Sequence, residues 1–128
     1  MKNKKIVLML IIILSIIGLS YVSFKYRELD KIRNICGIAQ RRLEETQTEW
    51  SHVGFRKMAE RNEFVKYCPH CKEIGENLAK GQTDIKQVYD MWRQSPTHNK
   101  NLTGNWTDRC LVYGEKDGVN YYVEIYAN

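Results

Sequence analysis

Three side chains of this chain are of the types that bind ligands or move protons, and their sequence context predicts that they meet. His98 follows the pair Ser95-Pro96, which ends a helix-like segment, Glu76 follows Gly75, and His52 precedes a short amphipathic stretch. Two imidazoles and a carboxylate at one site suit proton transfer, or a divalent cation such as zinc with one position open to water. These three residues are therefore the candidate site, with His52 and His98 as candidate metal ligands.

Four cysteines in a small exported domain indicate disulfides, and four cysteines allow three pairings: they are Cys36, Cys68, Cys71 and Cys110. The stretch Cys68-Pro69-His70-Cys71 has the spacing of a redox-active dithiol, which needs its first cysteine at a helix N-terminus. Here it leads into a glycine-containing loop instead. We expect structural bridges that tie this loop to Cys110 or Cys36, with the pairing open. A zinc site with His70, or thiol–disulfide exchange, is the alternative.

The N-terminus has the pattern of an export segment. A short basic lead is followed by an uncharged run over residues 6–24, close to the roughly 20 residues that span a bilayer. We expect residues 1–25 to be an uncleaved signal-anchor or a cleaved signal peptide. The protein is then membrane-anchored facing outside the cytoplasm, or secreted, with residues 26–128 as its domain.

The positive charge belongs to this segment and not to the domain. The formal net charge is +5, and five basic residues flank the uncharged run. The remaining 15 basic residues face all 15 acidic ones, so residues 28–128 carry no net charge. A domain with no basic excess is a poor partner for phosphates, and we exclude nucleic acid.

Hydrophobic periodicity predicts helices in the first part of the domain. Apolar residues at three- and four-residue steps predict a helix over residues 26–49, with Arg41, Arg42, Glu44 and Glu45 on its solvent side. Ser51 is the expected cap of a second helix. Residues 68–80 have the composition of a loop. Thr83 is the expected cap of a third helix, which ends at Ser95-Pro96.

The last quarter of the chain changes to a strand pattern. Residues 111–113 and 119–126 are rich in β-branched and aromatic residues, and Lys116-Asp117-Gly118 between them is a hairpin turn signal. Helices packed on a small antiparallel sheet, an α+β fold, are therefore predicted.

Two motifs resemble those of a known family. Gly75-Glu76-Asn77-Leu78-Ala79, followed by Trp92-Arg93-Gln94-Ser95-Pro96-Thr97-His98-Asn99-Lys100-Asn101-Leu102, resembles the bacterial-type members of the CAP superfamily (cysteine-rich secretory, antigen 5 and pathogenesis-related proteins) from about Leu29 onward. The resemblance implies a small α-β-α sandwich of three helices around an antiparallel sheet. The membrane segment takes the place of the family's first helix, so the domain looks trimmed.

The resemblance also implies a cleft. Glu76 and His98 match family site residues, His52 is the better match to the other histidine, and His70 is its rival. Ser95 stands where many members have a second glutamate, which weakens metal binding and hydrolysis. Asn77 and Asn101 are expected to hydrogen-bond backbone beside the cleft.

These patterns favour a binding module. An exported or membrane-tethered domain of this type is expected to present its cleft to a lipid, glycan, peptide or protein outside the cytoplasm. A metal-dependent or histidine-assisted hydrolase of peptide or cell-wall material is the first alternative. Thiol–disulfide exchange through Cys68 and Cys71 is the second.

Overall fold

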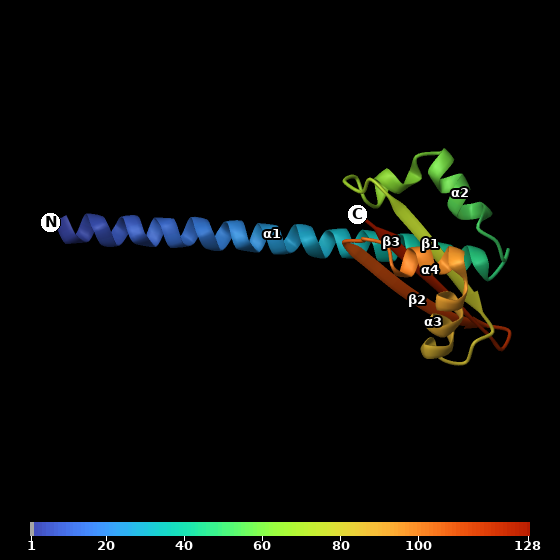
Figure 1. The fold of residues 1–128 in the computed structure, drawn as a ribbon. Helices are drawn as coiled ribbons and strands as arrows, with labels where there is room; N and C mark the ends of the chain where they lie inside the picture. Colours follow the sequence, from blue (N-terminus) through green and yellow to red (C-terminus); the bar gives the residue numbers. More distant parts are fainter. Residues whose placement is uncertain (1) are drawn as a thin grey trace. The chain divides into compact units, whose positions relative to one another are not determined.

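The structure is a computed structural model. It describes the backbone of residues 2–128, and the side chains of Met9, of residues 11–29 and of residues 34–128. The chain divides into two compact units, residues 1–31 and residues 32–128, and each is described by itself (Figure 1). Helix α1 (Lys2–Thr46) runs from the first unit into the second.

In the first unit, α1 carries apolar side chains that are exposed, from Met9 to Leu29. No helix among the residues that the structure describes is long and apolar enough to cross a membrane. Residues 6–8 and 10 of the predicted segment lie outside the described side chains. The anchor over residues 6–24 therefore stays a prediction.

In the second unit, α1 presents an apolar face to the sheet. Ile35, Ile38, Ala39 and Leu43 are buried on that face. The helix ends at Thr46, three residues before the predicted end at residue 49. The prediction that Arg42 lies on the solvent side is wrong, because its side chain is 1% exposed and pairs with a carboxylate of the sheet.

Two short helices follow α1. α2 (Val53–Glu60) contributes the buried Met58 to the core, and the 3₁₀ helix η1 (Glu63–Lys66) follows it directly. The prediction of Ser51 as cap of α2 is off by one residue, although its hydroxyl accepts a hydrogen bond from the amide of Val53 at 3.3 Å. The N-cap position itself is His52.

The sheet has three antiparallel strands in the order β1-β3-β2: β1 (Ile74–Lys80), β2 (Asp108–Lys116) and β3 (Val119–Ala127). The prediction of a loop over residues 68–80 is wrong for β1. Gly75, Glu76 and Asn77 have low strand propensity, and pairing with β3 overrides it. The predicted hairpin between β2 and β3 is confirmed, with Asp117 and Gly118 both at positive φ, as a tight turn requires.

Two helices follow β1. α3 (Ile85–Gln94) is capped by Asp84, whose carboxylate accepts from the amide of Gln87 at 2.9 Å, so the prediction of Thr83 as cap is off by one residue. α3 ends before Pro96, as predicted. Pro96 then begins a further helix, α4 (Pro96–Leu102), which was not predicted and which contains His98.

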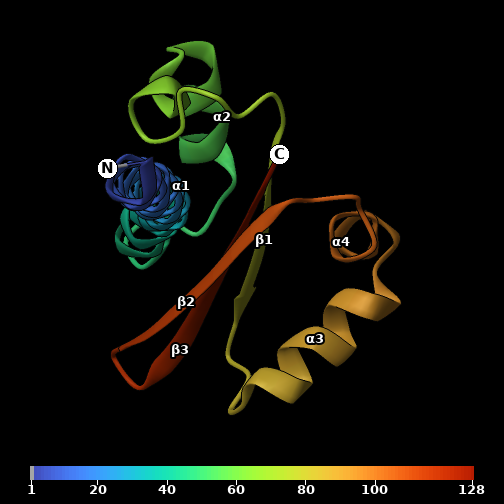
Figure 2. The ribbon, with the colours of Figure 1, turned by 90° about the vertical axis from the view of Figure 1, so that its left-hand side faces the viewer.

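The helices cover both faces of the sheet (Figure 2), so the α+β prediction is confirmed. On one face, α1 and α2 pack on Leu78, Val123 and Ile125. On the other, α3 packs on Ala79 and Tyr122 through Val88 and Trp92. The two cores are separated only by the sheet, since neighbouring residues of a strand point to opposite faces.

Both disulfides form in this unit. Cys36 of α1 bridges to Cys110 of β2, with 5.3 Å between their Cα atoms. Cys68 bridges to Cys71 across a four-residue turn. The prediction that the cysteines form disulfides is confirmed, but the prediction that Cys110 or Cys36 would pair with the Cys68–Cys71 loop is wrong. Cys110 shares a sheet face with Ile125, which faces α1, so Cys36 is its natural partner.

The two bridges should differ in how much they stabilise the fold. Cys36 and Cys110 are 74 residues apart and Cys68 and Cys71 only 3, so the first removes far more chain entropy from the unfolded state. We expect Cys36→Ser with Cys110→Ser to lower the free energy of unfolding by about 4 kcal/mol, against about 2 kcal/mol for Cys68→Ser with Cys71→Ser. Urea unfolding of both double variants measures this, and the reverse order would contradict it.

Candidate functional site

The candidate site is built around a buried carboxylate. Glu76 lies on β1 with its side chain 1% exposed, facing α1. The guanidinium of Arg42 donates to it twice, from Nε to Oε2 at 2.6 Å and from Nη2 to Oε1 at 3.3 Å. A buried carboxylate needs such a partner, because removing an unpaired charge from water is very unfavourable. Arg42 therefore sets the position of Glu76.

Arg42 is in turn held by two further groups. Its Nη1 donates to the carboxylate of Glu45, and its Nη2 donates to the carbonyl of Ser51 at 2.8 Å. Burial acts to lower the pKa of Arg42, and its hydrogen bonds to Glu76 and Glu45 outweigh that effect, so the pKa lies above the ordinary value. Gly54 completes the arrangement, because a Cβ at this position would collide with Arg42 and Glu45.

His52 lies against the same carboxylate. Its Nδ1 donates to Oε1 of Glu76 at 2.8 Å, and its side chain is 44% exposed. A carboxylate on Nδ1 fixes the tautomer and the orientation of an imidazole. In its neutral form the ring then offers Nε2 as an acceptor. His52 and His70 were the two candidates for the histidine beside Glu76, and His52 is the one that lies there.

His98 is oriented by a different partner. Its Nδ1 is 2.9 Å from the hydroxyl of Ser95, and its ring stacks on Trp92 with 6.4 Å between ring centroids. Burial, and secondarily the charge of His52, hold the pKa of His98 below the ordinary histidine value. Ser95 thus takes the orienting role for His98 that Glu76 takes for His52.

Side chains of the two motifs fix α4 to β1. The amide Nδ2 of Asn77 donates to the carbonyl of His98 at 3.0 Å. Nδ2 of Asn101 donates to the carbonyl of Glu76 at 3.2 Å and to Oδ1 of Asn77 at 2.9 Å. Both asparagines therefore bind backbone, as the sequence predicted. Their hydrogen bonds hold the helix that carries His98 at a fixed register along the strand that carries Glu76.

His70, the rival to His52, lies elsewhere. It is exposed in the turn that Cys68 and Cys71 close. Within the described part of the chain, it forms no hydrogen bond or ion pair with Glu76 or His98. Because Cys68 and Cys71 are joined to each other, they are also not available as thiolate ligands for a zinc ion beside His70.

The arrangement does not suit a metal ion. Across the described residues, no group of three or more histidine, cysteine, aspartate or glutamate side chains could hold one. Both oxygens of Glu76 already accept hydrogen bonds from Arg42 and His52. Zinc sites need at least three protein ligands, and His52 and His98 supply two. The pair is instead suited to hydrogen bonding and to proton transfer.

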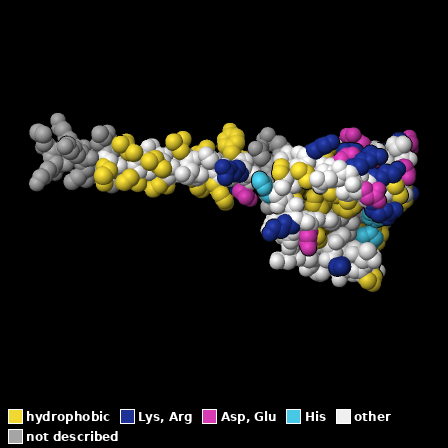
Figure 3. All heavy atoms as spheres, turned by 90° about the horizontal axis from the view of Figure 1, so that it is seen from above, with side chains coloured by type: hydrophobic (Ala, Val, Ile, Leu, Met, Phe, Trp, Pro, Cys, Tyr) yellow, Lys and Arg dark blue, Asp and Glu magenta, His cyan; other side chains and the backbone are white. Residues whose placement is uncertain are grey.

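Two hollows lie beside this site. One, of about 580 Å³, lies between α1 and α2, with Arg42 and Ser51 in its wall and charges of both signs around it. Figure 3 looks onto this side of the folded unit and shows Lys and Arg interspersed with Asp and Glu. The other, of about 610 Å³, lies along α4 and includes Trp106. Neither is lined by His52, Glu76 or His98.

The comparisons with known proteins add little. No family model and no curated protein matches the chain. A solved structure of an outer surface protein from Borrelia burgdorferi is similar to it, with a TM-score of 0.47 and 19% sequence identity over 67% of this chain and 72% of that chain.

The importance of Arg42 can be measured through stability. Arg42→Met leaves Glu76 buried without its partner, so we expect the free energy of unfolding to fall by about 3–5 kcal/mol. The double variant Arg42→Met with Glu76→Leu should recover a large part of that loss, because no unpaired charge remains. Urea unfolding of the wild type, of Arg42→Met, of Glu76→Leu and of the double variant gives the coupling free energy between the two side chains. Additive losses would show that the two side chains are independent.

The pH dependence of stability tests the lowered pKa of His98. The folded-state pKa of His98 lies below its ordinary, unfolded value, so the unfolded chain binds a proton first as the pH falls. The free energy of unfolding should therefore decrease as the pH drops through the ordinary histidine range and on through the folded-state pKa. In His98→Gln this decrease should be smaller.

Removing the neighbouring charge should raise the pKa of His98. We expect His52→Gln to move it toward the ordinary value, as followed by NMR titration of the ring Cε1 proton, because one of its two causes is then gone. His70→Gln is the matched control and should leave the pKa of His98 unchanged. An equal pKa in the His52→Gln variant would mean that the two rings do not interact.

Proposed function

We propose that this protein is an extracytoplasmic binding module of the CAP type. The observation that carries the proposal is the pair of imidazoles, each held through Nδ1 by its own partner: Glu76 for His52 and Ser95 for His98. Preorganised polar groups of this kind fix the orientation of a ligand, since they lose no freedom when it binds. Asn77 and Asn101 belong to the two motifs that resemble the family. Their hydrogen bonds join α4 to β1, and this joint role of the two motifs supports the proposal.

The proposed location is outside the cytoplasm, with residues 6–24 as a membrane tether. Two disulfides support an oxidising compartment, because thiols in the cytosol are kept reduced. The flanking basic residues and the absence of net charge in residues 28–128 support the same orientation. The ligand is a lipid, glycan, peptide or protein of the cell exterior.

A catalytic role is the less favoured function. The hydroxyl of Ser95 lies within hydrogen-bond distance of His98, which would suit proton transfer. However, Glu76 has both oxygens engaged by Arg42 and His52, so no second carboxylate remains to assist. Binding therefore agrees better with the geometry than hydrolysis does.

Ligand binding and turnover can be separated in one experiment. The full chain, in phosphocholine micelles, is titrated with three probes: anionic phospholipid, a chitin disaccharide and a short peptide. We expect the ring signals of His52 and His98 to shift together with one of them, without product formation, and the shift to be lost in the His52→Gln, His98→Gln double variant. Product formation that His98→Gln abolishes would instead support the hydrolase, and silence of both rings with all three probes would remove the binding proposal.

Zinc provides a further check on the same protein. With two imidazoles and no free carboxylate, zinc should bind no better to the wild type than to His98→Ala. Stoichiometric binding that His98→Ala abolishes, measured by calorimetry, would restore the metal site.

The bridge between Cys68 and Cys71 favours a second candidate function, thiol–disulfide exchange. Two observations weigh against it: Cys68 is 3% exposed, and the turn follows the end of η1 instead of beginning a helix. A redox titration distinguishes the roles. An active dithiol would be reduced near the potential of catalytic pairs and would exchange with a model dithiol, whereas a structural bridge requires a much stronger reductant.

A further inference from the structure

The hollow along α4 has the volume of a small-molecule site, and it is not lined by His52 or His98. Its volume of about 610 Å³ is within the ~300–1,000 Å³ typical of ligand pockets. Its walls come from the start of β1, from one side of α4 and from the segment that follows α4. The lining residues are Glu73, Ile74, Gly75, Thr97, Lys100, Asn101, Gly104, Asn105 and Trp106.

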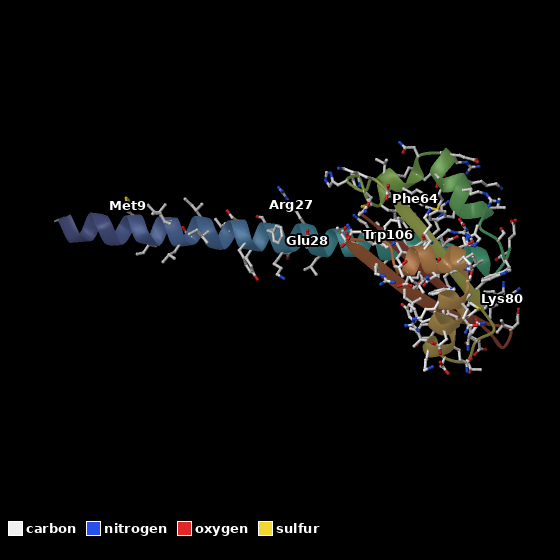
Figure 4. All side chains as sticks on the ribbon, in the orientation of Figure 1. Met9, Arg27, Glu28, Phe64, Lys80 and Trp106 are labelled. Atoms are coloured by element: carbon white, nitrogen blue, oxygen red, sulfur yellow. A yellow bond between two sulfur atoms is a disulfide. The ribbon has the colours of Figure 1, made fainter. Side chains whose placement is uncertain are left out.

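The aromatic ring of this hollow is held rigidly. Nε1 of Trp106 donates to the carbonyl of Asn101 at 2.8 Å, and its backbone amide donates to the carbonyl of Gly104 at 3.0 Å. A Cβ at Gly104 would collide with the indole, and one at Gly75 would come within 3.3 Å of it. In Figure 4, Trp106 lies between α4 and the beginning of β2. The two glycines therefore leave room for a ring that is half-buried and already fixed in place.

The polar groups around this ring are mixed in kind and balanced in charge. Lys100 and Glu73 are exposed and of opposite sign. Thr97 supplies a hydroxyl, and Asn105 an amide that can both donate and accept. An anionic ligand would require an excess of positive charge, and a purely apolar one would leave these groups without partners. A neutral ligand rich in hydroxyl groups satisfies both conditions.

We propose that this hollow binds a neutral saccharide of one or two sugar rings. The C–H face of a sugar packs on an indole, and its hydroxyl groups donate to and accept from amide, hydroxyl and charged side chains. The fixed position of Trp106 lowers the entropy lost on binding. The proposal concerns a second site and does not depend on what the histidine pair binds.

The test uses the full chain in phosphocholine micelles, because a sugar-based detergent would compete. The chain has three tryptophans, so the indole N–H region of the ¹H–¹⁵N spectrum resolves Trp106 from Trp50 and Trp92. N,N′-diacetylchitobiose and cellobiose are the probes, and inorganic phosphate is the anionic comparison. We expect a saturable shift of the Trp106 indole with at least one disaccharide, at millimolar affinity, that persists in the His52→Gln, His98→Gln double variant, while the indole signal of Trp50 stays in place.

Two exposed polar residues give variants that should fold. Lys100→Ala and Asn105→Ala should each weaken binding by about three- to tenfold, the effect of losing one hydrogen bond. Lys86→Ala, on the exposed side of α3, is the matched control and should have no effect. Absence of a saturable shift with both disaccharides would overturn the proposal. So would unchanged affinity in the Lys100→Ala, Asn105→Ala double variant, or a larger response to phosphate than to either sugar.

Discussion

The guanidinium of Arg42 and the carboxylate of Glu76 are buried between α1 and the sheet, and a buried pair of charges is tolerated only when every partner is in place. That condition fixes much of the surrounding structure. The carboxylate of Glu45 and the carbonyl of Ser51 accept further hydrogen bonds from the guanidinium of Arg42. A Cβ at Gly54 would collide with Arg42 and Glu45, so this position has no side chain. The position of His52 follows, because it donates to the same carboxylate.

A second buried carboxylate, Glu124 on β3, organises the opposite face of the sheet. The hydroxyl groups of Tyr89 and Tyr126 both donate to it, and Asn77 donates to the hydroxyl of Tyr126. Burial, followed by the charge of Glu124, raises the pKa of Tyr89 to about 12. The network therefore runs from α3 along this face of the sheet to Asn77, which also donates to the backbone carbonyl of His98. The imidazole of His52 thus binds one buried carboxylate of the sheet directly, whereas the other carboxylate is linked through Tyr126 and Asn77 to the backbone of His98.

The sequence predicted those features that depend on local pattern. The hairpin turn at Asp117-Gly118 and the end of α3 at Pro96 follow from backbone preferences of a few residues. The candidate residues His52, Glu76 and His98 came from motif context, and hydrogen bonds give Glu76 and His98 defined partners. Burial of Arg42 was missed because its partner lies 34 residues away. Strand β1 was missed for the same reason: it forms by pairing with β3, which is distant in sequence, and its own residues have low strand propensity.

The edge position of β1 explains why side chains, and not backbone, are left to recognise a ligand. β1 pairs with β3 on one side only, and an open strand edge attracts further strands. Here the indole of Trp92 donates to the carbonyl of Leu78 at 3.0 Å, and Asn101 donates to the carbonyl of Glu76. Alternate residues direct their carbonyls to the same edge, so both hydrogen bonds cover the open side of the strand. Residues from α3 and α4 thereby hinder strand addition. Because side chains alternate along the strand, Glu76 and Asn77 lie on opposite faces of β1, so Glu76 can bind His52 while Asn77 binds the backbone of His98.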